Sequence, residues 1–172
     1  PPPLFIGYTS DEFIDNGINT IELGIRKLVK AEEKRGLKGK NYVYKFDVPI
    51  PGWDNPGKFH SVDLWFFFET LAKCWRPFTG VHYDISRKMC NYMCNFIKTG
   101  NPNDNGLSSG LSPRAGVSYP PSKEENLKRY EESQEKLPEW KAFSSEEPNC
   151  MFFDTDCTLH SFDAEGEIKK YI

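Results

Sequence analysis

Strand-like and helix-like patterns of apolar residues alternate along the chain. Strand-like runs cover Pro3–Thr9 and Tyr42–Val48, and a shorter one ends at Met151–Phe153. Between the first two, apolar residues recur every three or four positions over residues 18–35, which is typical of an amphipathic helix. Two strands separated by a crossover helix normally lie parallel in one sheet. The pattern therefore predicts an α/β fold with a mostly parallel sheet and crossover helices.

The helical segments have recognisable ends. Gly36 is a plausible stop for the helix over residues 18–35. A second helix is predicted over residues 84–98, with Asp84 as its N-cap and Gly100 as its stop. A third helical pattern begins at Val62. The apolar side chains expected to pack these helices on the sheet are Ile18, Ile21, Ile25, Leu28 and Val29 in the first and Trp65, Phe67 and Phe68 in the third.

The C-terminal third is less regular. Residues 101–136 begin with turn-forming residues and continue as a charged segment with few apolar positions, so we interpret them as a loop and charged insertion. A strand over residues 157–163 could form a hairpin with Met151–Phe153. His160 would then be a polar residue on an edge strand rather than a catalytic one.

His60 is the strongest candidate for catalysis. It lies on the loop between the run Tyr42–Val48 and the next helix, where α/β enzymes often place a general base. Such a base needs a carboxylate to fix its tautomer. Glu12, just past the first strand, is the best candidate, and Asp11 and Asp63 compete with it.

Five segments together resemble one family. They are Gly7–Glu12, Tyr42–Phe46, Phe59–Leu64, Asn95–Asn103 and the pair Leu137–Trp140 with Cys150–Phe153. In this order they resemble the type B carboxylesterases, the cholinesterase-like branch of the α/β-hydrolases. The resemblance runs from about Pro3 to Asp154.

The resemblance implies a serine esterase that needs no cofactor and acts on small-molecule esters. In this family the residues of the catalytic triad follow one another along the chain as Ser, Glu and His. By position, Glu12 is therefore the triad acid and His60 the base. The family's nucleophile lies upstream on a G-x-S-x-G elbow. We therefore expect residues 1–172 to be the C-terminal portion of one α/β-hydrolase domain, partnered by the N-terminal portion of the same enzyme. The alternative is a non-catalytic cholinesterase-like binding or interaction domain.

A G-x-S-x-G sequence does occur at Gly106–Gly110. It follows a turn-forming run and precedes Leu111-Ser112-Pro113, whereas a nucleophile elbow needs a strand before it and a helix after it. It also follows the candidate acid and base instead of preceding them. We interpret it as a chance match in a loop.

Aromatic residues near His60 suggest where an ester could bind. Trp53 and Phe59 lie on the same loop, and ligand sites are mostly apolar with a few polar groups. These two residues are the candidates for the substrate pocket.

Composition narrows the function further. The net charge of −3 argues against a nucleic-acid partner, and no apolar run approaches the ~20 residues of a membrane span. Of the five cysteines, Cys90 and Cys94 are spaced four apart without histidines at ligand spacing, which favours reduced core thiols over a metal site. No N-x-S/T glycosylation acceptor is present, which favours a cytoplasmic enzyme over a secreted one.

Overall fold

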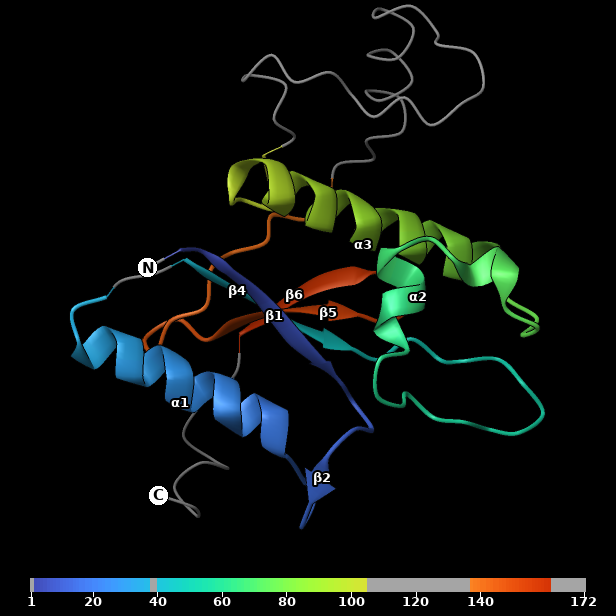
Figure 1. Cartoon of the computed structure of the whole chain (residues 1–172), viewed down its shortest axis with the longest axis horizontal. Coiled ribbons are helices and arrows are strands. Elements are labelled where there is room, and N and C mark those ends of the chain that lie inside the picture. The colour runs from blue at the N-terminus through green and yellow to red at the C-terminus, as the bar shows by residue number, and fades with distance from the viewer. Residues whose placement is uncertain (1, 38–39, 105–136, 162–172) are drawn as a thin grey trace, which may run out of the picture.

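The computed structural model describes residues 2–37, 40–104 and 137–161, in which helices cover both faces of a four-stranded sheet (Figure 1). The strand order is β1–β4–β5–β6. β1, β4 and β5 are parallel, and β6 is antiparallel to β5. The α/β class and the mostly parallel sheet are confirmed. The strands span Leu4–Thr9 (β1), Asn41–Phe46 (β4), Asn149–Phe153 (β5) and Cys157–Ser161 (β6).

The central strand β4 serves two cores. Tyr42, Tyr44 and Phe46 face one side of the sheet, where they pack with α2 (Asp63–Phe67) and α3 (Gly80–Thr99). Val43 faces the other side and packs against Ile25 and Val29 of α1 (Thr20–Lys34). Successive strand residues point to opposite faces, so one strand contributes to both cores. This burial on both faces explains why the strand reads as a nearly continuous apolar run.

The crossover helix α1 starts two residues later than predicted. Ile18–Asn19 form a short strand, β3, which pairs with β2 (Ile14–Asp15). The helix ends at Lys34, and Gly36 takes the left-handed conformation (φ 71°), as its proposed role as a stop requires. The prediction that Leu28 packs on the sheet was wrong, because this residue is exposed.

The long helix α3 begins four residues before its predicted start, so the assignment of Asp84 as N-cap was wrong. Thr79 is the N-cap, and its backbone N–H donates to His82 Nδ1 at 3.0 Å. His82 Nε2 then lies 3.1 Å from the carbonyl oxygen of Pro49 and is placed to donate to it. Both ring nitrogens of His82 therefore serve the fold. Gly100, with φ 76°, ends the helix as predicted.

The apolar pattern after Val62 forms a single short helix, α2, followed by a 3₁₀ turn at Leu71–Lys73. Phe67 packs on the core as predicted, whereas Phe68 is 61% exposed, so its predicted packing was wrong. Phe66 occupies the core instead, in edge contact with Phe46. The chain turns away here because Glu69 adopts a left-handed conformation (φ 50°).

The predicted C-terminal hairpin is confirmed as β5 and β6. His160 lies on the outermost strand β6, exposed to solvent and stacked on Phe152 at 4.1 Å between ring centroids. Most of the predicted insertion, including Gly106–Gly110, falls outside the described residues. Within the described ranges, no helix combines the length and apolarity needed to cross a bilayer.

Candidate active site

The candidate site lies where β1 and β4 end side by side. Thr9 pairs with Phe46 at the ends of these strands, and the N–H of Ser10 extends the ladder by donating to the Phe46 carbonyl at 2.9 Å. Because the strands are parallel, both of the following loops emerge at the same edge of the sheet. The first loop carries Glu12 and the second carries His60.

Glu12 is held by a compact turn at the end of β1. Its side chain is 7% exposed, and Oε1 accepts a hydrogen bond from the Thr9 N–H at 2.7 Å. Asn19 closes the turn by donating its side-chain N–H groups to the carbonyl oxygens of Thr9 (3.1 Å) and Glu12 (2.8 Å). The Asn19 Oδ1 also accepts from the N–H groups of Ile21 and Glu22 at the start of α1. This asparagine thus uses its full hydrogen-bonding capacity to join the turn to the helix.

His60 meets the carboxylate of Glu12 across the gap between the loops. Its Nδ1 lies 2.5 Å from Glu12 Oε2. The imidazole is 68% exposed, and Nε2 has no hydrogen-bond partner within the described part of the chain. A proton on Nδ1 shared with the carboxylate leaves Nε2 as the acceptor. An imidazole held in this way can act as a general base toward a hydroxyl group that approaches Nε2.

The two competing acids have other partners. Asp11 Oδ2 accepts a hydrogen bond from the backbone N–H of Lys58 at 2.7 Å. Asp63, the first residue of α2, is buried, and its Oδ2 accepts from the hydroxyl of Tyr44 at 2.7 Å. Glu12 is thus the carboxylate that contacts His60, while Asp11 bonds the loop that carries His60 and Asp63 bonds Tyr44 of β4.

Burial raises the pKa of Asp63 above its ordinary value, and the negative charge of Glu12 raises it further. The hydrogen bond from Tyr44 opposes this shift by stabilising the carboxylate. The pKa of Tyr44 is also raised, chiefly by burial and then by the charge of Asp63. A buried acid and phenol therefore lie close to Glu12.

The candidate pocket residues lie in different surroundings. Phe59 is half-buried and packs edge-on against Trp65, with ring centroids 5.6 Å apart. Trp53 is 89% exposed, and its ring lies 6.4 Å from that of Trp75. Phe13, which the sequence reasoning missed, makes an edge contact with the His60 ring at 5.1 Å. Its position directly after Glu12 was the only signal that could have identified it.

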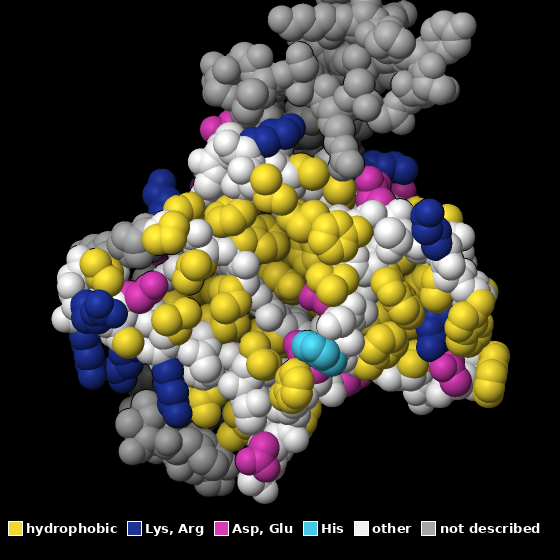
Figure 2. Space-filling view, viewed as in Figure 1, with side chains coloured by type: hydrophobic (Ala, Val, Ile, Leu, Met, Phe, Trp, Pro, Cys, Tyr) yellow, Lys and Arg dark blue, Asp and Glu magenta, His cyan; other side chains and the backbone are white. Residues whose placement is uncertain are grey.

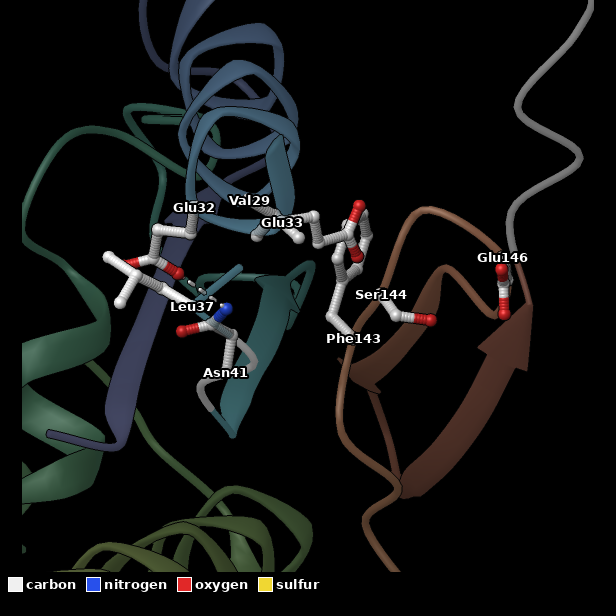
Figure 3. Close-up of a pocket in the computed structure, with 8 residues that line it drawn as sticks. All are labelled: Val29, Glu32, Glu33, Leu37, Asn41, Phe143, Ser144 and Glu146. Atoms are coloured by element: carbon white, nitrogen blue, oxygen red, sulfur yellow. Dashed lines mark hydrogen bonds between the residues drawn. The ribbon is translucent and has the colours of Figure 1, made fainter. Parts of the chain in front are cut away.

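A cavity of about 230 Å³ lies between the end of α1 and the segment around Phe143 (Figure 3). Two of its polar lining residues form hydrogen bonds within the protein. Glu32 accepts from the Asn41 side chain, and Glu33 accepts from the Ser145 N–H. Its lining residues include neither Glu12 nor His60. In the described ranges, no group of three or more His, Cys, Asp or Glu side chains is arranged to bind a metal ion.

Comparison with solved structures identifies similar folds. An esterase from anaerobic Clostridium hathewayi, described as able to hydrolyse aliphatic aromatic polyesters, matches with a TM-score of 0.55 and 17% identity, over 86% of this chain and 23% of the esterase. The Geobacillus stearothermophilus carboxylesterase EST55 matches with a TM-score of 0.55 and 19% identity, over 88% and 26%. The chain therefore spans about a quarter of the length of either esterase. Both matches support an α/β-hydrolase fold.

A search of curated protein sequences found no significant match. The model of the carboxylesterase family, by contrast, matches residues 12–169, which include both Glu12 and His60. This match extends over most of the sequence, and the chain therefore belongs to the carboxylesterase family.

Proposed function

We propose that this chain supplies the acid and the base of a Ser-Glu-His triad in a carboxylic ester hydrolase. His60 Nε2 takes the proton from a serine Oγ as that oxygen attacks the ester carbonyl, and returns it to the leaving alcohol. Glu12 holds the imidazole in the required tautomer and stabilises its cation. The serine and the oxyanion hole belong to the N-terminal portion of the same enzyme.

One observation carries this proposal, the contact between Glu12 Oε2 and His60 Nδ1 at 2.5 Å. The carboxylate is buried while the imidazole is exposed, so the acid is shielded from water and the base can be reached by a substrate. Membership of the carboxylesterase family makes ester hydrolysis the matching chemistry.

The surface around β1 supports the proposed N-terminal portion. β1 lies at one end of the four-stranded sheet, and Leu4, Phe5 and Ile6 are only half-buried. Figure 2 shows hydrophobic side chains gathered in a hollow of the surface over β1, beside α3. An apolar strand at a sheet edge is a surface on which further strands can add. The proposed partner would add its strands here.

The proposed ester pocket includes Phe59, Trp53 and Phe13. Phe13 contacts the His60 ring directly, and Phe59 precedes His60 and is supported by Trp65. These positions suit side chains that line the acyl or alcohol side of the reacting ester. Trp53 is largely exposed and its ring lies tilted beside that of Trp75, so we assign it the outermost part of the pocket.

The decisive experiment compares this chain with the full-length enzyme. Both are assayed for hydrolysis of a short-chain aryl ester and labelled with a fluorophosphonate, which reacts with activated serines. The proposal expects activity and label on an upstream serine in the full-length enzyme and neither in this chain. Label on Ser108 in this chain alone would instead make Gly106–Gly110 a genuine nucleophile elbow. An unlabelled and inactive full-length protein would favour a non-catalytic binding domain.

A further inference from the structure

His60, the candidate general base, lies on a loop that needs support from other parts of the molecule. β4 ends at Phe46, and residues 47–59 form a long loop before His60. The ring of His60 is mostly exposed, and Ser61 beside it has a left-handed backbone (φ 69°) that a non-glycine residue adopts only at a cost. Something beyond the loop itself must therefore hold His60 in place.

A buried link between the sheet and the end of this loop is the hydrogen bond from Tyr44 to Asp63. Tyr44 belongs to β4, and Asp63 starts α2 three residues after His60. Their oxygens are 2.7 Å apart, and both residues are buried. The hydrogen bonds from Leu64 N–H to the Ser61 carbonyl and from Val62 N–H to the Phe59 carbonyl (both 3.2 Å) then connect α2 to the turn that carries His60.

Tyr44 is itself fixed. It stands opposite Gly7 of β1, and a Cβ atom at Gly7 would collide with its ring. The ring also packs against Phe5 and Phe67, with centroids 5.7 and 5.1 Å away. The hydroxyl of Tyr44 therefore has a defined position, and it fixes the carboxyl group that accepts its hydrogen bond.

We propose that Asp63 is a positioning residue that, through Tyr44, holds His60 in register with Glu12. This inference rests on the proposed function of His60 as the general base. Burial of both partners gives their hydrogen bond more weight than an exposed one, because neither group can exchange its partner for water. The raised pKa of Asp63 agrees with a carboxyl group that packs inside the protein instead of facing substrate.

The test uses Tyr44→Phe, Asp63→Ala and Asp63→Asn in the full-length enzyme. The first two remove the hydrogen bond, whereas asparagine keeps an oxygen that can accept it. Two quantities are measured: the rate of serine labelling by the fluorophosphonate and the strongly deshielded proton NMR signal of the His60 Nδ1 proton. Glu12→Gln, which replaces the carboxylate partner of that proton, identifies the signal. Tyr92→Phe is the matched control, because Tyr92 is also buried and donates to a carbonyl, that of Pro138, at 2.6 Å.

We expect Tyr44→Phe and Asp63→Ala to slow labelling by about 10- to 100-fold and to shift or broaden the Nδ1 signal, since small displacements of a catalytic group have effects of this size. Asp63→Asn should restore both toward wild type, and Tyr92→Phe should leave both unchanged. A wild-type signal and labelling rate in Tyr44→Phe would overturn the proposal, even if Asp63→Ala failed to fold. Because the NMR signal does not require turnover, it tests positioning even if the enzyme proves inactive.

Discussion

The loops after β1 and β4 hold their candidate catalytic residues in opposite ways. Glu12 lies three residues beyond its strand in a short turn, with its carboxylate bonded to the Thr9 N–H and its carbonyl to Asn19. His60 lies fourteen residues beyond its strand, is mostly exposed and depends on contacts from elsewhere. The candidate acid is therefore organised by local sequence, whereas the candidate base is organised by tertiary packing and, in our proposal, by the hydrogen bond between Tyr44 and Asp63.

The largest effect is expected from breaking the pair itself. Glu12→Gln or His60→Ala in the full-length enzyme should lower kcat by about 10³- to 10⁴-fold, because the tautomer and the proton acceptor are lost. Steady-state hydrolysis of an aryl ester measures this. Asp11→Asn is the matched control, since among the described residues the Asp11 carboxylate accepts a hydrogen bond from the Lys58 backbone N–H and makes none with His60. If Asp11→Asn lost activity while Glu12→Gln kept it, the assignment of the acid would be wrong.

We expect a large loss of stability when the turn that holds Glu12 loses the side chain of Asn19. Asn19→Ala removes the cap of α1 and both carbonyl contacts of the Glu12 turn. We expect it to lower the free energy of unfolding by about 1–3 kcal/mol, measured by urea denaturation. Asn16→Gly is the control, because Asn16 is exposed, its side chain bonds only the neighbouring Asp15 side chain among the described residues, and glycine tolerates its left-handed backbone (φ 50°). Equal stabilities of the two variants would mean that the turn is not held by Asn19.

The aromatic residues should show a graded effect on substrate binding. Phe13→Ala and Phe59→Ala are expected to raise KM for an aryl ester by up to about ten-fold, the effect of removing an aromatic contact. Trp53→Ala should raise it less, because Trp53 is 89% exposed. A larger effect at Trp53 than at Phe13 would place the pocket along the outer part of the loop.

The smallest effect concerns pH. The folded-state pKa of Asp63 is raised, so its contribution to stability is complete below its ordinary pKa of 3.8 and is lost as pH rises through the raised value. Asparagine has no side-chain proton that titrates in this range. The stability of the Asp63→Asn variant therefore lacks this pH-dependent loss. Asp63→Asn should therefore gain stability relative to wild type as pH rises from below 3.8.

Asp156→Asn provides the opposite case. The hydrogen bond from Lys88 lowers the pKa of Asp156, so its contribution is present above the ordinary value and is lost as pH falls. Relative to wild type, Asp156→Asn should thus lose stability as pH rises, although its exposure makes this effect smaller. Urea denaturation at several pH values measures both. Parallel slopes for the two variants would contradict the assigned directions.

The sequence predicted what depends on periodicity and strand ends. Parallel β1 and β4 and the crossover helix followed from the apolar pattern, and the proximity of Glu12 and His60 followed from strand ends meeting at one edge. The features that the sequence did not predict depend on which of several nearby side chains occupies a given position, such as the N-cap of a helix. Thr79 and His82 form the start of α3 in place of Asp84, and His82 also bonds the carbonyl oxygen of Pro49, a contact that a local pattern cannot reveal.

The same limit applies to the aromatic residues near the site. In the run Trp65–Phe68, the helix is too short to establish a period, so the sequence could not tell that Phe66 would be buried and Phe68 exposed. Phe13 reaches His60 from a left-handed backbone position (φ 47°), which no propensity of phenylalanine predicts.

The contact between Gly7 and Tyr44 constrains how this protein can vary. Gly7 lies in ordinary strand backbone that does not by itself require glycine, yet any larger residue there would strike the Tyr44 ring. A library that randomises each position of β1 should therefore be depleted at Gly7 while its neighbour Ile6, whose side chain points to the other face, accepts other apolar residues. Larger residues should survive at position 7 only in double variants that also shrink position 44, so these two positions should vary together.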